Sequence, residues 1–134
     1  MLNVTIVTPE KIFYDGEVVS LIVPGSEGYL GVLTDHAPLM TAVTPGKVTI
    51  KDKARQELLL AVSYGFFEVS SNHATLLVDS VEFISDIDLQ KARDALERAR
   101  TRLADRAGNI DIPRARRAFA RARNRIRLAA DGEE

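Results

Sequence analysis

The spacing of apolar residues changes once along the chain, near Ser85. Before that point apolar and polar positions alternate in short runs, the pattern of strands whose successive side chains point to opposite faces. The clearest runs are Leu2-Val4-Ile6, Val19-Leu21-Val23, Val48-Ile50, Leu58-Leu60-Val62 and Ala74-Leu76-Val78. We therefore expect residues 1–84 to form a β-domain.

Turn-forming pairs separate these runs at short intervals. They are Asp15-Gly16, Pro24-Gly25, Pro45-Gly46, Asp52-Lys53, Tyr64-Gly65 and Ser71-Asn72. Short strands with such frequent turns favour an antiparallel sandwich or barrel over alternating strands and helices. A domain of this size buries roughly 60% of the unfolded chain's surface, which is enough for it to fold alone.

After Ser85 the apolar residues recur at intervals of three and four, which predicts two amphipathic helices. The first stripe is Leu89, Ala92, Leu96, Ala99 and Leu103, and the second is Ile112, Ala115, Phe119, Ala122, Ile126 and Ala129. Nearly half of these residues are alanine, which lets helices approach closely but buries little area. We expect a marginally closed hairpin, a plausible two-state element.

Capping residues set the expected helix ends. Ser85 or Asp86 is expected to cap the first helix, and Asn109 or Asp111 the second, where Pro113 falls in the first turn. Gly108 supplies the break between the helices. Because the link is short, the helices should be antiparallel neighbours.

Composition adds a charge division to this picture. The 134 residues carry a formal net charge of −1, yet residues 1–84 sum to −5 and residues 85–134 to +4. The absence of cysteine excludes disulfides, thiolate metal clusters and a cysteine nucleophile. No apolar stretch approaches the ~20 residues needed to span a bilayer, so we expect membrane association only through a partner.

Candidate catalytic and metal chemistry is sparse. Residues 25–31 contain three glycines but lack the Lys-Ser/Thr pair and following helix of a phosphate loop, so ordinary turns are favoured. His36 and His73 are the only histidines, too few for a three-histidine metal site. No nucleophile-elbow pattern occurs. We expect neither catalytic residues nor a metal site.

The strongest polar feature is a row of arginines within residues 113–127, which contain no acidic residue. The row consists of Arg114, Arg116, Arg117, Arg121, Arg123, Arg125 and Arg127. A basic helix of this kind fits nucleic-acid phosphates, and it equally fits a nucleotide or an acidic protein surface. The remaining alternative is a solvated face partly neutralised by Asp94, Glu97 and Asp105 of the facing helix.

Two consecutive segments carry a family resemblance. Gly28-Tyr29-Leu30-Gly31-Val32-Leu33, followed by Asp35-His36-Ala37-Pro38-Leu39, closely resembles the signature of the epsilon subunit of F-type ATP synthases. Further matching segments are Val7-Thr8-Pro9, Gly65-Phe66-Phe67-Glu68-Val69 and Ile87-Asp88. The resemblance covers nearly the whole chain.

The resemblance implies an α+β protein, with a ten-stranded antiparallel β-sandwich over residues 1–84 and a two-helix hairpin over residues 85–134. It also implies a non-catalytic subunit that couples ion flow to ATP synthesis. This subunit would form the central rotor stalk with the gamma subunit, on the membrane rotor ring at the cytoplasmic face of a bacterial plasma membrane. Expected ring and stalk contacts are Glu27, Gly28, Tyr29, Gly31 and His36.

The resemblance also gives the helical domain a regulatory role. In such subunits the hairpin switches to an extended form that rises into the catalytic head and restrains ATP hydrolysis. The residues expected to meet the alpha and beta subunits are Arg114, Arg116, Arg117, Arg121, Arg123 and Arg125. The alternative function from another class is a small nucleic-acid-binding protein with a basic helix; under the ATP synthase interpretation we expect no nucleic-acid partner.

Some members of the family bind ATP through an Ile/Leu-Asp-x-x-Arg-Ala motif. The corresponding segment is Ile87-Asp88-Leu89-Gln90-Lys91-Ala92, with lysine at the arginine position. The resemblance implies a site formed by Glu82, Ile87, Asp88, Lys91, Ala92, Arg98, Arg121 and Arg125. Because lysine lacks the planar fork of arginine, we expect weak or lost binding of regulatory ATP, and no required cofactor.

Overall fold

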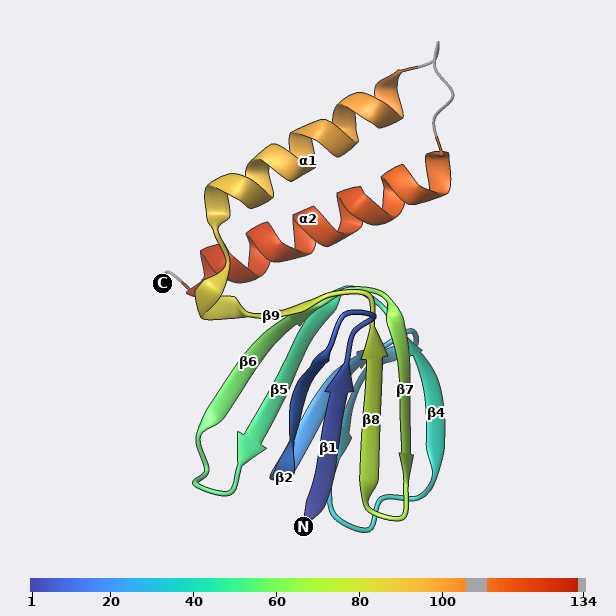
Figure 1. Ribbon diagram of the computed structural model, residues 1–134, viewed down its shortest axis with the longest axis vertical. Coiled ribbons are helices and arrows are strands. Elements are labelled where there is room, and N and C mark those ends of the chain that lie inside the picture. The colour runs from blue at the N-terminus through green and yellow to red at the C-terminus, as the bar shows by residue number, and fades with distance from the viewer. Residues whose placement is uncertain (106–110, 133–134) are drawn as a thin grey trace. The chain divides into compact units, whose positions relative to one another are not determined.

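The computed structural model describes residues 1–105 and 111–132, so the predictions for Gly108 and Asn109 lie outside the described residues. Contacts divide the chain into two compact units, Met1–Phe83 and Ile84–Glu134. Strands occupy the first unit and helices the second (Figure 1). The two units are described separately below.

Nine strands form the first unit, all of them within the described residues. They are β1 (Leu2–Val7), β2 (Ile12–Gly25), β3 (Gly28–Val32), β4 (Leu39–Val43), β5 (Gly46–Asp52), β6 (Glu57–Val62), β7 (Gly65–Ser70), β8 (His73–Val78) and β9 (Val81–Phe83). The predicted β-sandwich is confirmed: alternate side chains of the strands are buried between its layers, as in β1 and β5.

Strand order in the sheet is β1-β8-β7-β4-β2-β5-β6-β9, and β3 pairs with β2. Figure 1 shows β1, β8, β7 and β4 side by side. The pairs are antiparallel except β1 with β8, which run parallel, so the sheet departs at this place from the all-antiparallel expectation. A parallel pair needs a long connection, and here β2 to β7 supply it.

The strand β2 explains the difference between nine observed and ten expected strands. A bulge interrupts its register between Val18 and Ser20. The part before the bulge pairs with β1, the part after it pairs with β3, and pairing with β5 runs across the bulge from Val18 to Ile22. The single strand β2 thus makes the pairings that two shorter strands were expected to make.

The bulge also changes which side chains of β2 enter the core. Val18, Leu21 and Val23 are buried, and Val19, expected in the core, is only half-buried. An extra residue in one strand reverses the alternation of faces beyond it. The runs in β1, β5 and β8 alternate as predicted, whereas in β6 the intervening Ala61 is also buried.

One predicted turn was wrong. Asp15 and Gly16 lie inside β2, where they pair with Thr5 and Val4 of β1. A Cβ added at Gly16 would lie 3.4 Å from the Tyr14 hydroxyl oxygen, which is an ordinary van der Waals contact, so packing does not require glycine here. Long-range pairing with β1 has overridden the local turn preference of this Asp-Gly pair.

The second unit begins with the 3-10 turn η1 (Ile84–Asp86) and continues with the helices α1 (Leu89–Ala104) and α2 (Ile112–Gly132). The first cap was predicted two residues early. Asp88 is the N-cap of α1, and its Oδ1 accepts a hydrogen bond from the Lys91 N–H at 3.1 Å. Ser85 and Asp86 do not cap α1, because they belong to the preceding 3-10 turn η1. In this turn the Ile87 N–H donates a hydrogen bond to the Ile84 carbonyl.

The start of α2 agrees with the second capping prediction. Asp111 Oδ1 accepts a hydrogen bond from the Arg114 N–H at 3.1 Å, and Pro113 lies in the first turn. The two helices pack against each other, as the predicted hairpin requires.

Alanines form the buried part of this helix interface. Those that are buried are Ala92, Ala99, Ala115, Ala122 and Ala129. The larger members of the predicted stripes, such as Leu96 and Phe119, are only half-buried at its margins. Close approach through alanine buries little apolar area, and this agrees with the expectation of a weakly sealed hairpin.

Candidate functional site

An exposed row of apolar side chains crosses the outer face of one layer of the sandwich. Register pairs Val7 with Leu77, Leu77 with Phe66, and Phe66 with Ala42, so the row spans β1, β8, β7 and β4. Phe66 is 61% exposed and Leu77 50%. We call these four residues the apolar row.

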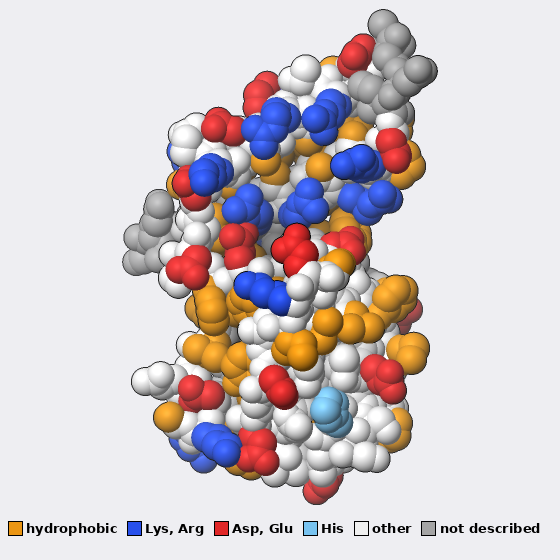
Figure 2. Space-filling view, viewed as in Figure 1, with side chains coloured by type: hydrophobic (Ala, Val, Ile, Leu, Met, Phe, Trp, Pro, Cys, Tyr) orange, Lys and Arg blue, Asp and Glu red, His pale blue; other side chains and the backbone are white. Residues whose placement is uncertain are grey.

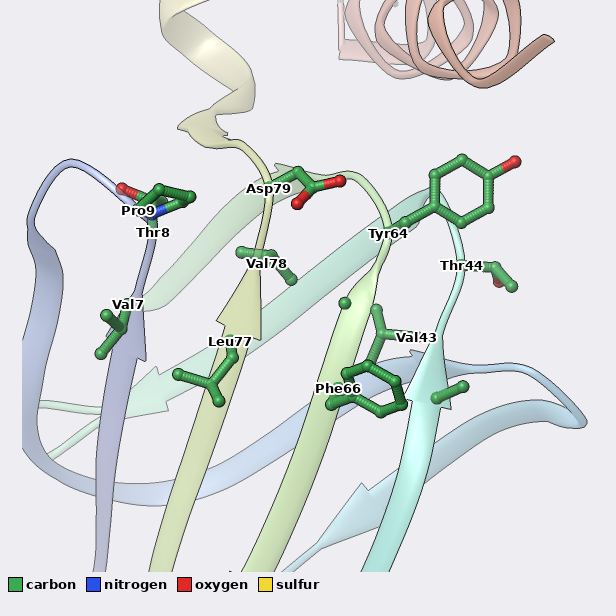
Figure 3. A pocket seen from close by; sticks show the side chains of 12 residues that line it. Val7, Thr8, Pro9, Val43, Thr44, Tyr64, Phe66, Leu77, Val78 and Asp79 are labelled. Atoms are coloured by element: carbon green, nitrogen blue, oxygen red, sulfur yellow. The ribbon is translucent and has the colours of Figure 1, made fainter. Parts of the chain in front are cut away.

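The apolar row forms the floor of a groove of about 630 Å³. Figure 3 shows Leu77 and Phe66 on adjacent strands, with Tyr64 and Asp79 at the upper end of the groove. Asp79 is the one charged residue among those lining it. Contiguous exposed apolar surface with a polar rim is typical of a protein docking site. Sequence analysis did not find this groove, because its strands are far apart in the chain.

The residues expected to contact the ring lie mainly on the hairpin of β2 and β3. Gly25 pairs with Gly28 and closes a turn at Ser26 and Glu27, which confirms ordinary turn structure here. Glu27 is exposed at the tip, and Gly28 has a φ of 130°, which glycine adopts readily. Tyr29 is 57% exposed, but its hydroxyl accepts a hydrogen bond from the Lys47 N–H at 2.9 Å.

His36 lies in the loop between β3 and β4 and is half-buried. Its Nδ1 donates a hydrogen bond to the Ala37 carbonyl at 2.6 Å, and its backbone N–H donates to the Leu33 carbonyl at 3.2 Å. His73 contacts Thr5 through Nε2 at 3.3 Å. The two histidines thus make hydrogen bonds to different neighbours, His36 to Ala37 and His73 to Thr5.

A cavity of about 140 Å³ lies between α1 and α2 and is lined by basic side chains and alanines. Its residues are Ala95, Arg98, Ala99, Arg102, Ala118, Arg121, Ala122 and Arg125. We call its four arginines the arginine cluster. Figure 2 shows lysine and arginine side chains, in blue, gathered over the two helices.

The arginine cluster is a favourable place for an anion. None of the cavity's lining residues is acidic. Within residues 1–105 and 111–132, no ion pair is formed by Arg98, Arg102 or Arg121. These three guanidinium groups, held together without counterions, repel one another, and a phosphate or carboxylate group would relieve this repulsion through forked hydrogen bonds.

Two of the acidic residues expected to neutralise the arginines of α2, Asp94 and Glu97, make side-chain contacts within α1. Glu97 forms an ion pair with Arg100 of its own helix at 3.2 Å. Asp94 accepts a hydrogen bond from the Gln90 side chain at 3.0 Å. Both contacts are local to α1, so they do not account for the basic row of α2.

The expected nucleotide site is only partly assembled in the cavity. The structure brings together Arg98, Arg121 and Arg125, and it adds Arg102, which sequence analysis missed. Lys91 is exposed. It lies about two helical turns before Arg98, on the same side of α1. Heptad spacing from Lys91 through Arg98 was the signal that could have pointed to this side of the helix.

The other residues of the expected nucleotide site have structural surroundings of their own. Asp88 caps α1, Ile87 is half-buried beside it, and Ala92 lies fully buried in the helix interface. Glu82 belongs to β9 in the other unit. None of these four residues lines the cavity.

The arginine row of α2 divides between two sides of the helix. At about 100° per residue, the first side carries Arg114, Arg117, Arg121 and Arg125, and the opposite side carries Arg116, Arg123 and Arg127. The first side flanks the interface with α1, since Arg121 and Arg125 line the cavity. Arg127 donates a hydrogen bond to Asn124 Oδ1 at 2.9 Å.

No helix in the described part of the chain combines the length and the apolar composition that crossing a membrane requires.

Two family models match the chain in succession. The model described as ATP synthase, Delta/Epsilon chain, beta-sandwich domain matches residues 1–84. The model described as ATP synthase, Delta/Epsilon chain, long alpha-helix domain matches residues 85–130. Together they cover the strands and both helices.

Curated relatives and solved structures agree with these models. An ATP synthase epsilon chain of Moorella thermoacetica is 45% identical over 78% of each chain, and one of Brevibacillus brevis is 38% identical over 78% of this chain and 80% of its own. The fold resembles a chain in the Euglena gracilis mitochondrial ATP synthase, with a TM-score of 0.75, 19% identity, and coverage of 98% and 80%. These matches lend no support to the nucleic-acid-binding alternative. With both of its parts matched in order, the chain belongs to the delta/epsilon chain family of ATP synthases.

Proposed function

We propose that this chain is the epsilon subunit of an F-type ATP synthase, a non-catalytic component of the central stalk. It couples rotation of the membrane ring, driven by ion flow, to ATP synthesis in the head. The observation that carries the proposal is the apolar row, an exposed docking surface on a sandwich that matches this family. The epsilon-chain relatives support the same assignment.

The apolar row is the surface on which the gamma subunit docks. Substituting Phe66→Glu places a charge in the centre of the row without disturbing the core, because Phe66 is already exposed. The expected result is loss of gamma-subunit capture by about tenfold or more, since desolvating an unpaired carboxylate in an interface is costly. Leu59→Glu is the matched control, because Leu59 is exposed on β6, outside the row.

Capture of the gamma subunit by the unmodified chain tests the function itself. Failure to co-purify with the gamma subunit and the alpha and beta subunits would contradict the central-stalk assignment. Equal capture by the Phe66→Glu and Leu59→Glu chains would leave the assignment intact but move the docking surface away from the apolar row.

The helical hairpin regulates ATP hydrolysis in this proposal. Its alanine interface is weak enough to open, and the arginines of α2 then become available to acidic surfaces of the alpha and beta subunits. Removing residues from Ser85 onward should leave the sandwich able to join the complex and should relieve inhibition of hydrolysis. Unchanged hydrolysis by complexes with and without the hairpin would show that it is not inhibitory.

The arginine cluster supports weak binding of ATP through its phosphates. Titration of the full chain with ATP by calorimetry should show weak binding, further reduced by Arg121→Ala and unaffected by Arg116→Ala on the opposite side of α2. Lys91→Arg should tighten binding, because it restores a forked donor. Tight saturable binding by the unmodified chain, abolished by Asp88→Asn, would refute the expectation of weak binding.

The remaining contacts follow from the assembly. The hairpin tip at Glu27 and Gly28 approaches the rotor ring, with Gly31 beside it, and the loop of His36 lies at the base of the stalk. The protein is therefore held at the cytoplasmic face of the bacterial plasma membrane through the complex. Cross-linking from a cysteine placed at Glu27 to the ring, absent from a cysteine placed at Gln56, tests this placement.

A further inference from the structure

The side chain of Tyr29 bridges two strands that are not neighbours. Tyr29 lies on β3 opposite Pro24 of β2, and β2 pairs in turn with β5. The Tyr29 hydroxyl passes over β2 and accepts a hydrogen bond from the Lys47 N–H at 2.9 Å. The bond therefore ties the hairpin of β2 and β3 to the beginning of β5.

The bridge supplies an acceptor opposite Pro24. The Pro24 carbonyl accepts a hydrogen bond from the Thr44 N–H at 3.1 Å, so it is engaged outside β5. The Lys47 N–H obtains its partner from a side chain instead. A backbone donor of this kind is costly to leave without a partner.

Gly46 makes room for the bridge. A Cβ added at Gly46 would lie 2.7 Å from the Tyr29 hydroxyl oxygen and 2.6 Å from Pro24 Cβ. Gly46 itself is buried beneath the phenol. The tyrosine and the glycine thus fit each other, and a larger residue at either place would break the contact.

The bridge adds to the anchors that this hairpin already has, which are the pairing of β3 with β2 and the packing of Leu30 against the core. Gly28 and Gly31 have no side chains, and a Cβ on either would meet nothing within 4 Å. On the β2 side, the Ser26 N–H donates to the Ala42 carbonyl at 2.9 Å. On the β3 side, the Tyr29 bridge is the side-chain anchor nearest to the tip that carries Glu27.

We infer that Tyr29 is a positioning residue, which holds the tip of the β2–β3 hairpin in the geometry that contacts the rotor ring. Its hydroxyl accepts the hydrogen bond from the Lys47 N–H. The inference rests on the proposed function, in which the rotor ring is the partner that contacts the tip. A tip ordered in advance costs no ordering free energy when the ring binds.

Hydrogen exchange on the full chain tests the bridge itself. Tyr29→Phe removes the hydroxyl oxygen at an exposed position and leaves the ring in place, so the chain should fold normally. The Lys47 amide should lose protection by roughly fivefold or more, the equivalent of one hydrogen bond. Tyr14→Phe, which removes a hydroxyl elsewhere on β2, should leave this amide unchanged. Unchanged Lys47 protection in Tyr29→Phe would overturn the bridge.

Affinity for the ring tests the positioning role. The complex of the full chain with the gamma subunit is titrated onto detergent-solubilised rotor ring. Tyr29→Phe should lower the thermal unfolding midpoint of the free chain, because one hydrogen bond is lost, and should in addition weaken ring binding of the fully folded chain by roughly fivefold. A residue with only a structural role would shift the midpoint and leave the affinity of the folded chain unaltered.

The outcomes separate the inference from the function on which it rests. If the unmodified complex does not bind the ring, the proposed ring contact fails and the positioning role fails with it, while the exchange result still decides the bridge. If the unmodified complex binds and Tyr29→Phe binds equally well despite lost Lys47 protection, the positioning role alone is overturned.

Discussion

Asp35 and Asn72, which are 37 residues apart in sequence, exchange two hydrogen bonds. The Asp35 N–H donates to Asn72 Oδ1, and the Asn72 amide donates to Asp35 Oδ1 at 3.0 Å. Both residues have left-handed backbones, with φ of 66° and 61°. The pair fastens the loop that carries His36 to the turn between β7 and β8, so this loop is held by the sandwich.

Two substitutions of Asn72 should separate the contribution of its hydrogen bonds to stability from the contribution of its left-handed backbone. Asn72→Ala loses both hydrogen bonds and places alanine, which tolerates the left-handed region less well than asparagine, at this φ, so the free energy of unfolding should fall by about 2–3 kcal/mol. Asn72→Gly loses the same bonds without that strain and should cost about 1 kcal/mol less. Urea unfolding followed by circular dichroism measures both. Equal losses in the two variants would show that the left-handed backbone carries no penalty here.

Enlarging a buried alanine should loosen the helical hairpin. Ala92 is fully buried in the interface of α1 and α2, so Ala92→Leu should lower hairpin stability by about 1–3 kcal/mol through overpacking. Thermal loss of helical circular dichroism in the full chain is the measurement. Ala104→Leu at the exposed end of α1 is the control, with an expected change within about 0.5 kcal/mol. Greater stability of Ala92→Leu would mean that the interface has unfilled space.

The position of the α1 cap can be tested with three substitutions. Asp88→Ala should destabilise the helix by about 1 kcal/mol, because the Lys91 N–H loses its acceptor. Asp88→Asn should have a smaller effect, since asparagine caps about equally well. Asp86→Ala should leave helix stability nearly unchanged. The helical signal during thermal unfolding measures all three, and a larger loss for Asp86→Ala than for Asp88→Ala would return the cap to its predicted place.

Alkaline pH should destabilise the sandwich through Tyr14. Partial burial, and to a lesser extent the negative charge of Asp52, raise the pKa of Tyr14 above its ordinary value of 10.0. Because the pKa is higher in the folded than in the unfolded chain, this contribution is complete below about pH 10 and is lost as pH rises through the folded pKa. Urea midpoints at about pH 9 and about pH 11 measure the loss. Tyr14→Phe should remove part of the pH dependence, and an identical dependence in that variant would contradict the assignment.

The local patterns of the sequence were sufficient for the type and order of the main elements. Alternation over Leu2, Val4 and Ile6 predicts a strand with one buried face, and the structure buries all three side chains. Recurrence over Ala92 and Ala99 likewise predicts the buried side of α1. These predictions succeed because the direction of a side chain relative to its own strand or helix follows from the local backbone geometry alone.

Register and long-range contacts were decided only by the tertiary structure. Asp15-Gly16 has the sequence of a turn, but pairing with β1 makes it part of a strand. The apolar row needs the register of four strands, and Arg102 joins the arginine cluster only because α2 lies against its side of α1. The bond from Lys47 to Tyr29 depends on β2 lying between their strands. The sequence by itself determined which residues could be buried within each element, whereas the sites depend on how separate elements align, which is a property of the folded chain.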